Sequence, residues 1–146
     1  MPRERYLRTL RALARCYQSF ERYSAAHIRA LGLTPSQFDI VATLGNTPGM
    51  TFKELGEETL ITKGTLTGVV DRLEERGLVR RIGSATDGRS TVVALTRRGE
   101  NEFARSFPAH IAYLKQPFST LAAADLDALD ALLDRLCAAF HGERAE

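Results

Sequence analysis

Residues 62–95 decide the fold of this chain, and they read TKGTLTGVVDRLEERGLVRRIGSATDGRSTVVAL. In the part 62–76, apolar side chains recur at steps of three and four, which predicts an amphipathic helix closed by Gly77. The apolar stripe of this helix consists of Leu66, Val69, Val70 and Leu73. Thr62 stands directly before the helix as a candidate N-cap residue.

The polar face of this helix is unusual for a solvated surface. Glu and Lys normally dominate an exposed helix face, because they favour the helix and keep it soluble. Here the first two turns carry hydroxyl residues and glycines, which are poor helix formers that let another molecule approach closely. The polar face consists of Lys63, Gly64, Thr65, Thr67, Gly68, Asp71 and Arg72.

The residues after Gly77 follow a different pattern. The runs 78–82 and 91–95 are rich in β-branched residues, and the loop between them contains Asp87-Gly88. This order predicts a β-hairpin, with Arg89 near its tip. The chain is therefore expected to be mainly α-helical with one small β element.

Two helices are expected between the first thirty residues and Thr62. Thr34-Pro35-Ser36-Gln37 combines a Thr cap, a Pro at the first helical position and a Gln three residues after the cap. A short helix then opens at Thr51 with a second capping box. Together with the helix over 62–76, this short helix gives a helix-turn-helix over about 52–76.

The two ends of the chain are also predicted to be helical. Residues 4–31 carry an apolar stripe over a length of about 40 Å, which is more than one small core needs and indicates a partner. A helix begins again at Thr96, and Pro108 predicts a kink or break in it. Pro117 and Phe118 are expected in a connection, and a leucine-rich helix is expected over 122–140.

Composition places the chain among ordinary globular proteins. It has 146 residues, 44% of them apolar and 26% charged, which suits one domain and excludes collagen-like or disordered chains. Cys16 and Cys137 lie far apart, so we expect free thiols in a reducing cytoplasm. We expect no membrane segment, no cofactor and no metal. Residues 61–100 hold eight Lys and Arg against five Asp and Glu, a weak sign of a polyanion partner.

Two short helices followed directly by a β-hairpin with a basic tip form the plan of a winged helix-turn-helix. Such a protein places its second helix in the major groove of DNA, where residues near the helix start reach bases and phosphates. An Arg at the hairpin tip can enter the narrow, negatively charged minor groove. Binding of double-stranded DNA is therefore the function that this order of elements favours.

The sequence resembles the MarR-type winged-helix transcriptional regulators over nearly its whole length. Four stretches carry this resemblance in the same order and spacing: LTPSQF at 33–38, LTGVVDRLEERGLV at 66–79, DGRS at 87–90 and ALTRRG at 94–99. One departure is that Leu121 is followed by Ala122 where the family usually has a Ser or Thr cap.

The resemblance implies an organisation and a quaternary state. It implies a single domain, 1–146, in which a winged-helix lobe, 34–95, contains the helix-turn-helix and a wing over about 78–96. Helices within 4–31 and 96–141 are implied to form a dimerisation region that intertwines with a second copy. The implied wing contact is Arg89 in the minor groove, positioned by a salt bridge with Asp87.

From the residues and the resemblance together, we expect a cytoplasmic regulator that represses a pseudo-palindromic operator as a homodimer. A small ligand, of the anionic aromatic kind, is expected to release it. The expected DNA-binding residues are Thr51, Thr62, Lys63, Gly64, Thr65, Thr67, Gly68, Arg72, Asp87, Arg89 and Ser90. A ligand pocket would be lined by Tyr17, Phe20, Tyr23 and Phe38.

Three alternatives remain open at this point. Enzyme activity is not expected, since no Ser–His–Asp arrangement, P-loop or nucleotide fingerprint occurs and a lone carboxylate such as Asp39 proves nothing. A winged helix used only for protein contact would lack salt-dependent DNA retention. A thiol-based redox regulator would use Cys16, although nothing in the sequence places a base beside it. The three histidines show no metal-ligand spacing.

Overall fold

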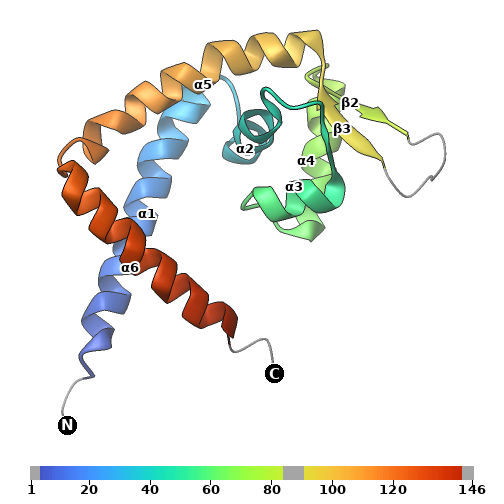
Figure 1. The fold of residues 1–146 in the computed structure, drawn as a ribbon. Helices are drawn as coiled ribbons and strands as arrows, with labels where there is room; N and C mark the ends of the chain where they lie inside the picture. The colour runs from blue at the N-terminus through green and yellow to red at the C-terminus, as the bar shows by residue number, and fades with distance from the viewer. Residues whose placement is uncertain (1–3, 84–90, 143–146) are drawn as a thin grey trace. The chain divides into compact units, whose positions relative to one another are not determined.

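The computed structural model describes residues 4–83 and 91–142 and confirms a mainly α-helical chain with a small β-sheet (Figure 1). The chain forms two compact units, Met1–Ile111 and Ala112–Glu146, which are described one at a time. Within the described ranges, the elements in chain order are α1 (Tyr6–Ala30), α2 (Pro35–Leu44), β1 (Met50–Thr51), α3 (Phe52–Glu58), α4 (Lys63–Glu75), β2 (Val79–Ile82), β3 (Val92–Leu95), α5 (Arg97–Phe118) and α6 (Ala123–Gly142).

The expected helix starts and stops are present where the sequence has capping residues. At the start of α2, the Thr34 hydroxyl accepts from the Gln37 N–H and the Gln37 side chain accepts from the Thr34 N–H, a complete capping box. The Thr51 hydroxyl accepts from the Glu54 N–H at the start of α3. Gly77 ends α4 with a φ of 74°, the left-handed conformation that favours glycine.

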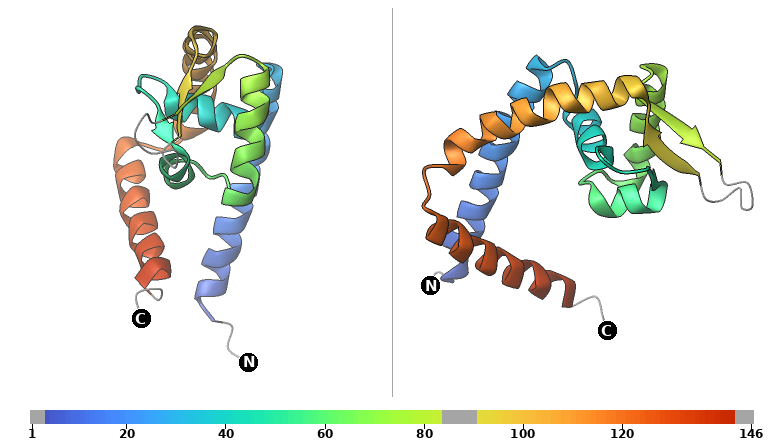
Figure 2. Two further views of the ribbon diagram at one scale, coloured as in Figure 1. Left: turned by 90° about the vertical axis from the view of Figure 1, so that its right-hand side faces the viewer. Right: turned by 45° about the horizontal axis from the view of Figure 1, so that its top comes forward.

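The sheet is larger than the predicted hairpin. β2 and β3 pair antiparallel as expected, and β1 adds on the other side of β3, so that the order among the described strands is β1-β3-β2 (Figure 2). Met50 faces Val93 in this register. Gly49, with a φ of 118°, allows β1 to lie so close, because a Cβ there would run into the β3 backbone and Val92. A two-residue strand carries no periodicity, so the sequence pattern missed it.

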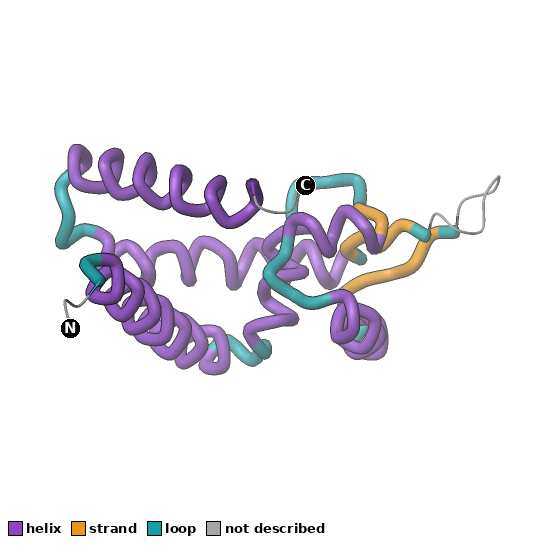
Figure 3. The backbone as a smooth tube through the Cα atoms, turned by 90° about the horizontal axis from the view of Figure 1, so that it is seen from below, coloured by secondary structure: helices purple, strands orange, loops and turns teal. Residues whose placement is uncertain are grey.

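The core of the first unit lies where α2, α3, α4 and the sheet meet. Its fully buried side chains come from all of these elements, which is typical of one continuous hydrophobic core. The largest of them are Ile40, Val41, Leu44, Leu55, Val70, Leu73, Val79 and Val93. Figure 3 shows that the strands are confined to one region and that helices make up the rest of this unit.

The start of α5 is joined tightly to the end of α4 and to β2. The Thr96 hydroxyl donates to the Gly77 carbonyl, and the Thr96 N–H donates to the Leu78 carbonyl over 3.0 Å. Gly99 is buried one turn later, where a Cβ would overlap the Leu78 carbonyl. The first turn of α5 is therefore fixed to the winged-helix lobe.

Of the kink or break expected at Pro108, the break is wrong, since α5 is continuous from Arg97 to Phe118. Proline removes one N–H, and the carbonyl that loses its partner belongs to Ala104, which is exposed and can be hydrated. Phe103 and Phe107 also pack on the core just before Pro108 and hold this part of the helix. Pro117 and Phe118 likewise belong to the last turn of α5, not to a connection.

The second unit consists of the end of α5 and α6. Ala122 cannot cap α6 with a side chain, but the Asp125 carboxylate accepts from the Ala122 N–H over 3.3 Å. None of the α6 residues, all of them within the described part of the chain, is buried. In its leucine stripe Leu126 is half-buried, and the following leucines are exposed, with fractions from 37% at Leu136 to 58% at Leu132.

Candidate nucleic-acid interface

The turn between α3 and α4 sets the position of the candidate recognition helix. The Thr59 hydroxyl donates to the Leu55 carbonyl over 2.6 Å, and the Leu60 N–H donates to the Asp39 carboxylate over 3.0 Å. Partial burial raises the pKa of Asp39, although its bond to the Leu60 N–H opposes this shift. Asp39 on α2 therefore has a structural role in holding the helix-turn-helix turn.

The structure confirms that α4 is amphipathic, as the sequence predicts. Leu66, Val70 and Leu73 are buried, and Val69 is half-buried. The other side exposes Thr62, Lys63, Gly64, Thr65, Thr67, Gly68, Asp71 and Arg72. A Cβ built at Gly64 or at Gly68 meets nothing within 4 Å, so a flat surface lies between the exposed threonines.

Two threonines bond differently from what the sequence suggests. Thr62 is the N-cap residue of α4 by position, but its hydroxyl lies 2.6 Å from the Thr65 hydroxyl and makes no capping bond. The expected side-chain cap at Thr62 is therefore wrong, because Thr65 bonds it instead. Thr51 is half-buried, and its hydroxyl also donates to the Glu54 carboxylate over 3.2 Å. The predicted wing contacts Asp87, Arg89 and Ser90 lie outside the described residues.

Arg81 on β2 joins the sheet to the recognition helix. Its guanidinium forms ion pairs with Asp71 and, over 2.9 Å, with Glu74, both on α4. The same group lies 5.7 Å from the centre of the Phe52 ring at the start of α3. The hydrogen bond to Asp71 is the main cause that raises the pKa of Arg81. Arg81 thus contacts all three elements of the candidate interface.

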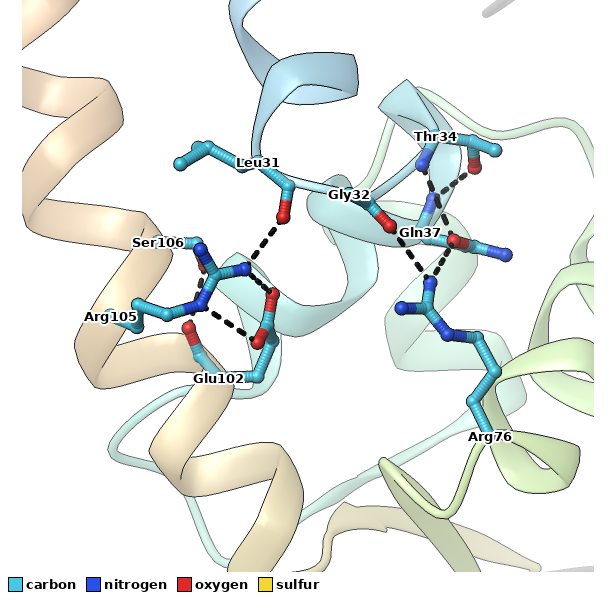
Figure 4. Close-up of polar contacts among 8 residues, drawn as sticks. All are labelled: Leu31, Gly32, Thr34, Gln37, Arg76, Glu102, Arg105 and Ser106. Atoms are coloured by element: carbon cyan, nitrogen blue, oxygen red, sulfur yellow. Dashed lines mark hydrogen bonds and ion pairs between the residues drawn. The ribbon is translucent and has the colours of Figure 1, made fainter.

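Two further arginines are used inside the first unit and hold the connection between α1 and α2 (Figure 4). Arg76 at the end of α4 donates to the Gly32 carbonyl over 3.2 Å and to the Gln37 side chain over 2.9 Å. Arg105 on α5 pairs with Glu102 and donates to the Leu31 carbonyl. Sequence analysis missed these roles, because the partners of Arg76 and the Leu31 carbonyl lie far away along the chain.

The four aromatic residues proposed for a ligand pocket lie in different environments. Tyr17 and Phe20 on α1 are exposed and Tyr23 is half-buried, whereas Phe38 on α2 is buried against the His110 ring. A cavity of about 340 Å³ occurs elsewhere in this unit, beside the end of α2 and the first turns of α5. Its lining is Leu44, Asn46, Thr47, Leu95, Glu100, Phe103 and Ala104.

A pair of histidines, of which His110 is buried and His27 half-buried, lies behind Phe38. His110 is 2% exposed, and its Nε2 lies 3.0 Å from the Ser24 hydroxyl on α1. The Nδ1 atoms of His110 and His27 lie 2.9 Å apart, close enough to share one hydrogen bond. Burial, and secondly His27, lower the pKa of His110. Among the residues that the structure describes, no three His, Cys, Asp or Glu side chains gather as a metal site.

Both cysteines are free and exposed, Cys16 on α1 and Cys137 on α6. In the described structure neither thiol is joined to the other in a disulfide, as the distance between them along the sequence predicts. A search of the described helices found none that is both long and apolar enough to cross a bilayer.

Two curated relatives show what the chain is similar to. It is 36% identical over 92 residues to the transcriptional regulator HosA of Escherichia coli, covering 62% of this chain and 68% of HosA. It is 29% identical over 133 residues to the HTH-type transcriptional regulator MhqR of Bacillus subtilis, covering 91% of this chain and 92% of MhqR. Both relatives are transcriptional regulators and not enzymes.

Solved structures and a family model agree with these relatives. Sco3205 of Streptomyces coelicolor, solved in complex with DNA, shares the fold at a TM-score of 0.85 and 22% identity, over 94% of this chain and 89% of that chain. The Mycobacterium tuberculosis MarR family protein Rv2887, solved with salicylic acid, has a TM-score of 0.65 and 27% identity, over 86% and 93%. A model of the MarR family matches residues 31–90. The chain belongs to the MarR family of winged-helix, DNA-binding transcriptional regulators.

Proposed function

We propose that the chain is a homodimeric repressor of a pseudo-palindromic operator, with one α4 in the major groove of each half-site. The observation that carries this proposal is the exposed face of α4, on which threonines alternate with glycines at the positive end of the helix. Such a face allows the helix backbone to approach base edges and phosphates closely. Half-sites about one helical turn apart would match a two-fold protein.

Gly64 and Gly68 would let the backbone of α4 approach the DNA, and the other predicted DNA-binding residues each have a proposed task. Lys63 and Arg72 are the exposed cations of the α4 face and would meet phosphates, whereas Thr65 and Thr67 would meet base edges. Thr51 and Thr62 flank the two helices of the motif, near the backbone of the DNA. Arg89, positioned by Asp87 and with Ser90 beside it, would reach the flanking minor groove.

The homodimer is supported by apolar side chains that the single chain leaves uncovered. Tyr6, Leu10 and Tyr17 on α1 are 61%, 53% and 47% exposed, and Phe140 on α6 is 63% exposed. Exposed apolar surface at regular helical positions over two long helices is typical of a protein–protein interface. A second copy of the same chain would cover both helices in an isologous contact.

Release from DNA by a small anionic aromatic ligand is the second part of the proposal. The relative Rv2887 has been solved with salicylic acid, and Tyr17, Phe20, Tyr23 and Phe38 would supply an aromatic site here. Salicylate is therefore the probe to use. It should lower the affinity for DNA, and Tyr23→Ala should reduce that response without changing binding in its absence. If DNA binding is unchanged at millimolar salicylate, this part of the proposal is wrong.

The decisive experiment for DNA binding is a salt titration on an operator selected from a random pool. If each protomer neutralises about three to five phosphates, log K should fall against log salt with a slope of roughly −5 to −9. Arg89→Ala should weaken binding at least about tenfold and reduce the slope, with the dimer intact. Changes at Thr65 or Thr67 should alter the preferred sequence more than the slope.

The same experiment separates the main alternative, a winged helix that binds only proteins. Such a protein would not be retained on duplex DNA or heparin at any salt concentration. Equal affinities and slopes for the wild type and Arg89→Ala would show that the hairpin does not touch DNA.

A further inference from the structure

Asp71 is the residue of the α4 face that fits DNA binding least well. It follows Thr67 by four residues and Gly68 by three, so it lies on the same side of α4 one turn further on. Its side chain is 50% exposed. A free carboxylate there would lie next to the phosphates that the first two turns are proposed to contact, and like charges repel.

The structure supplies a counter-charge for Asp71 from a different element. Arg81 on β2 pairs with Asp71 and Glu74 at once, and its guanidinium also faces the Phe52 ring. Three partners from two helices fix the direction of this long side chain, which is only 30% exposed. Exposed salt bridges contribute about 0–1 kcal/mol to stability, so a stabilising role alone is a weak reason for this arrangement.

We propose that Arg81 is a positioning residue for DNA binding, which neutralises Asp71 so that the α4 face can approach the phosphate backbone. This inference rests on the proposed function, since it concerns the same face of α4. Arg81 acts through Asp71 and not by touching DNA itself. Because Arg81 belongs to β2, the same ion pairs also hold the strand at the base of the wing against α4.

The proposal predicts that substitutions at Arg81 and Asp71 have non-additive effects on the affinity for DNA. Arg81→Gln leaves Asp71 unpaired, so the affinity for the selected operator should fall about tenfold at moderate salt. Asp71→Asn in the Arg81→Gln background removes the exposed charge, and affinity should return to within about threefold of the wild type. Arg81→Lys keeps a cation near Asp71 and should retain most of the affinity. Fluorescence anisotropy with a labelled duplex measures all four proteins.

A matched control separates charge from general destabilisation. Arg105→Gln breaks an ion pair with Glu102 on α5, outside the α4 face, and should leave operator affinity unchanged. Thermal unfolding of each variant should shift by only a few degrees. A loss of affinity in Arg105→Gln equal to that in Arg81→Gln would overturn the proposal.

The remaining outcomes distinguish this inference from the proposed function. If the wild type does not bind DNA, the proposed function fails. If the wild type binds and the double variant is as weak as Arg81→Gln, Arg81 contacts DNA directly or supports the wing alone, and the inference fails. A salt slope for the double variant that is shallower than the wild-type slope by about one for each protomer would identify the direct contact.

Discussion

The winged-helix core and helix α6 differ sharply in how they cover their apolar residues. Val41, Leu55 and Leu73 in the first unit are fully buried by neighbouring elements. In α6, the leucines from Leu129 to Leu136, at similar helical spacing, stay between 37% and 58% exposed. Apolar residues with the same helical periodicity are therefore buried by other elements of the chain in the winged-helix core, whereas in α6 they stay exposed. Periodicity predicts which face of a helix will be covered, but not by what.

The largest effect is expected from substitutions in the exposed leucine stripe of α6. Replacing both Leu129 and Leu133 by Asp places two charges on the exposed stripe of α6, where the proposed dimer would bury them. We expect monomeric or unfolded protein, measured by light scattering and circular dichroism. A folded wild-type protein of 16.2 kDa at micromolar concentration would contradict the dimer.

The second largest effect is expected from a substitution in the buried core of the first unit. Leu73→Ala opens a cavity in the covered core and should lower the free energy of unfolding by about 2–5 kcal/mol. Leu133→Ala removes apolar surface that the proposed dimer would bury, so it should raise the dissociation constant of the dimer, whereas Leu73→Ala should leave that constant unchanged. The measurements are urea unfolding and analytical ultracentrifugation of both variants over a series of protein concentrations. An equal dissociation constant in the two variants would remove the distinction between the regions.

A smaller effect is expected on the pH dependence of stability, through His110 at the contact between α1 and α5. Its folded-state pKa is lowered, so the unfolded chain binds the extra proton first as the pH falls. Neutral His110 makes its full contribution to the free energy of unfolding above its ordinary pKa of about 6.5. This contribution is lost as the pH falls below that value toward the folded-state pKa. The slope is at most about 1.4 kcal/mol per pH unit.

Replacing the imidazole of His110 tests this pH dependence. His110→Gln should flatten the dependence of the unfolding free energy between about pH 7 and pH 5. Chemical denaturation of the wild type and the variant at several pH values is the measurement. A wild-type protein that becomes more stable on acidification would reverse the sign and contradict the role of His110.

The smallest expected effect is at Cys16, an exposed thiol on α1. Cys16→Ser should leave operator affinity unchanged, with or without peroxide, because nothing in the described structure pairs this thiol with another cysteine. The measurement is DNA binding after mild oxidation. A wild-type protein that peroxide releases from DNA, together with a resistant serine variant, would make the chain a redox switch.

Local signals in the sequence predicted most of the fold and one face of the site. The capping residues Thr34 and Thr51, the stop at Gly77 and the stripe of α4 each act within a few residues, so they can be read from spacing. The third strand could not be predicted from spacing, because β1 has two residues and pairs with Val93 far along the chain. Pro108 predicted a kink or break, and the break is absent, because the cost of its missing N–H depends on whether the freed Ala104 carbonyl meets water.

Within the candidate site, the roles of the arginines could not be predicted from the sequence either. Arg72, Arg76 and Arg81 are similar in sequence context, yet Arg72 lies on the exposed α4 face, Arg76 holds the α1–α2 connection and Arg81 pairs with Asp71. The partner decides which cation remains available for DNA, and partners come from tertiary structure. A count of basic residues therefore overestimates the charge that an interface offers.

The hydrogen bonds at Thr96 and the close packing at Gly99 fix the first turn of α5 to the turn between α4 and β2. Within the first unit, α5 runs from Arg97 to Ile111, a length of about 22 Å at 1.5 Å per residue. A tilt of roughly 5° about its first turn would displace Ile111 by about 2 Å. Conversely, a displacement of that size at Ile111 would rotate the first turn of α5, and with it Gly77 and Leu78, which are hydrogen-bonded to Thr96.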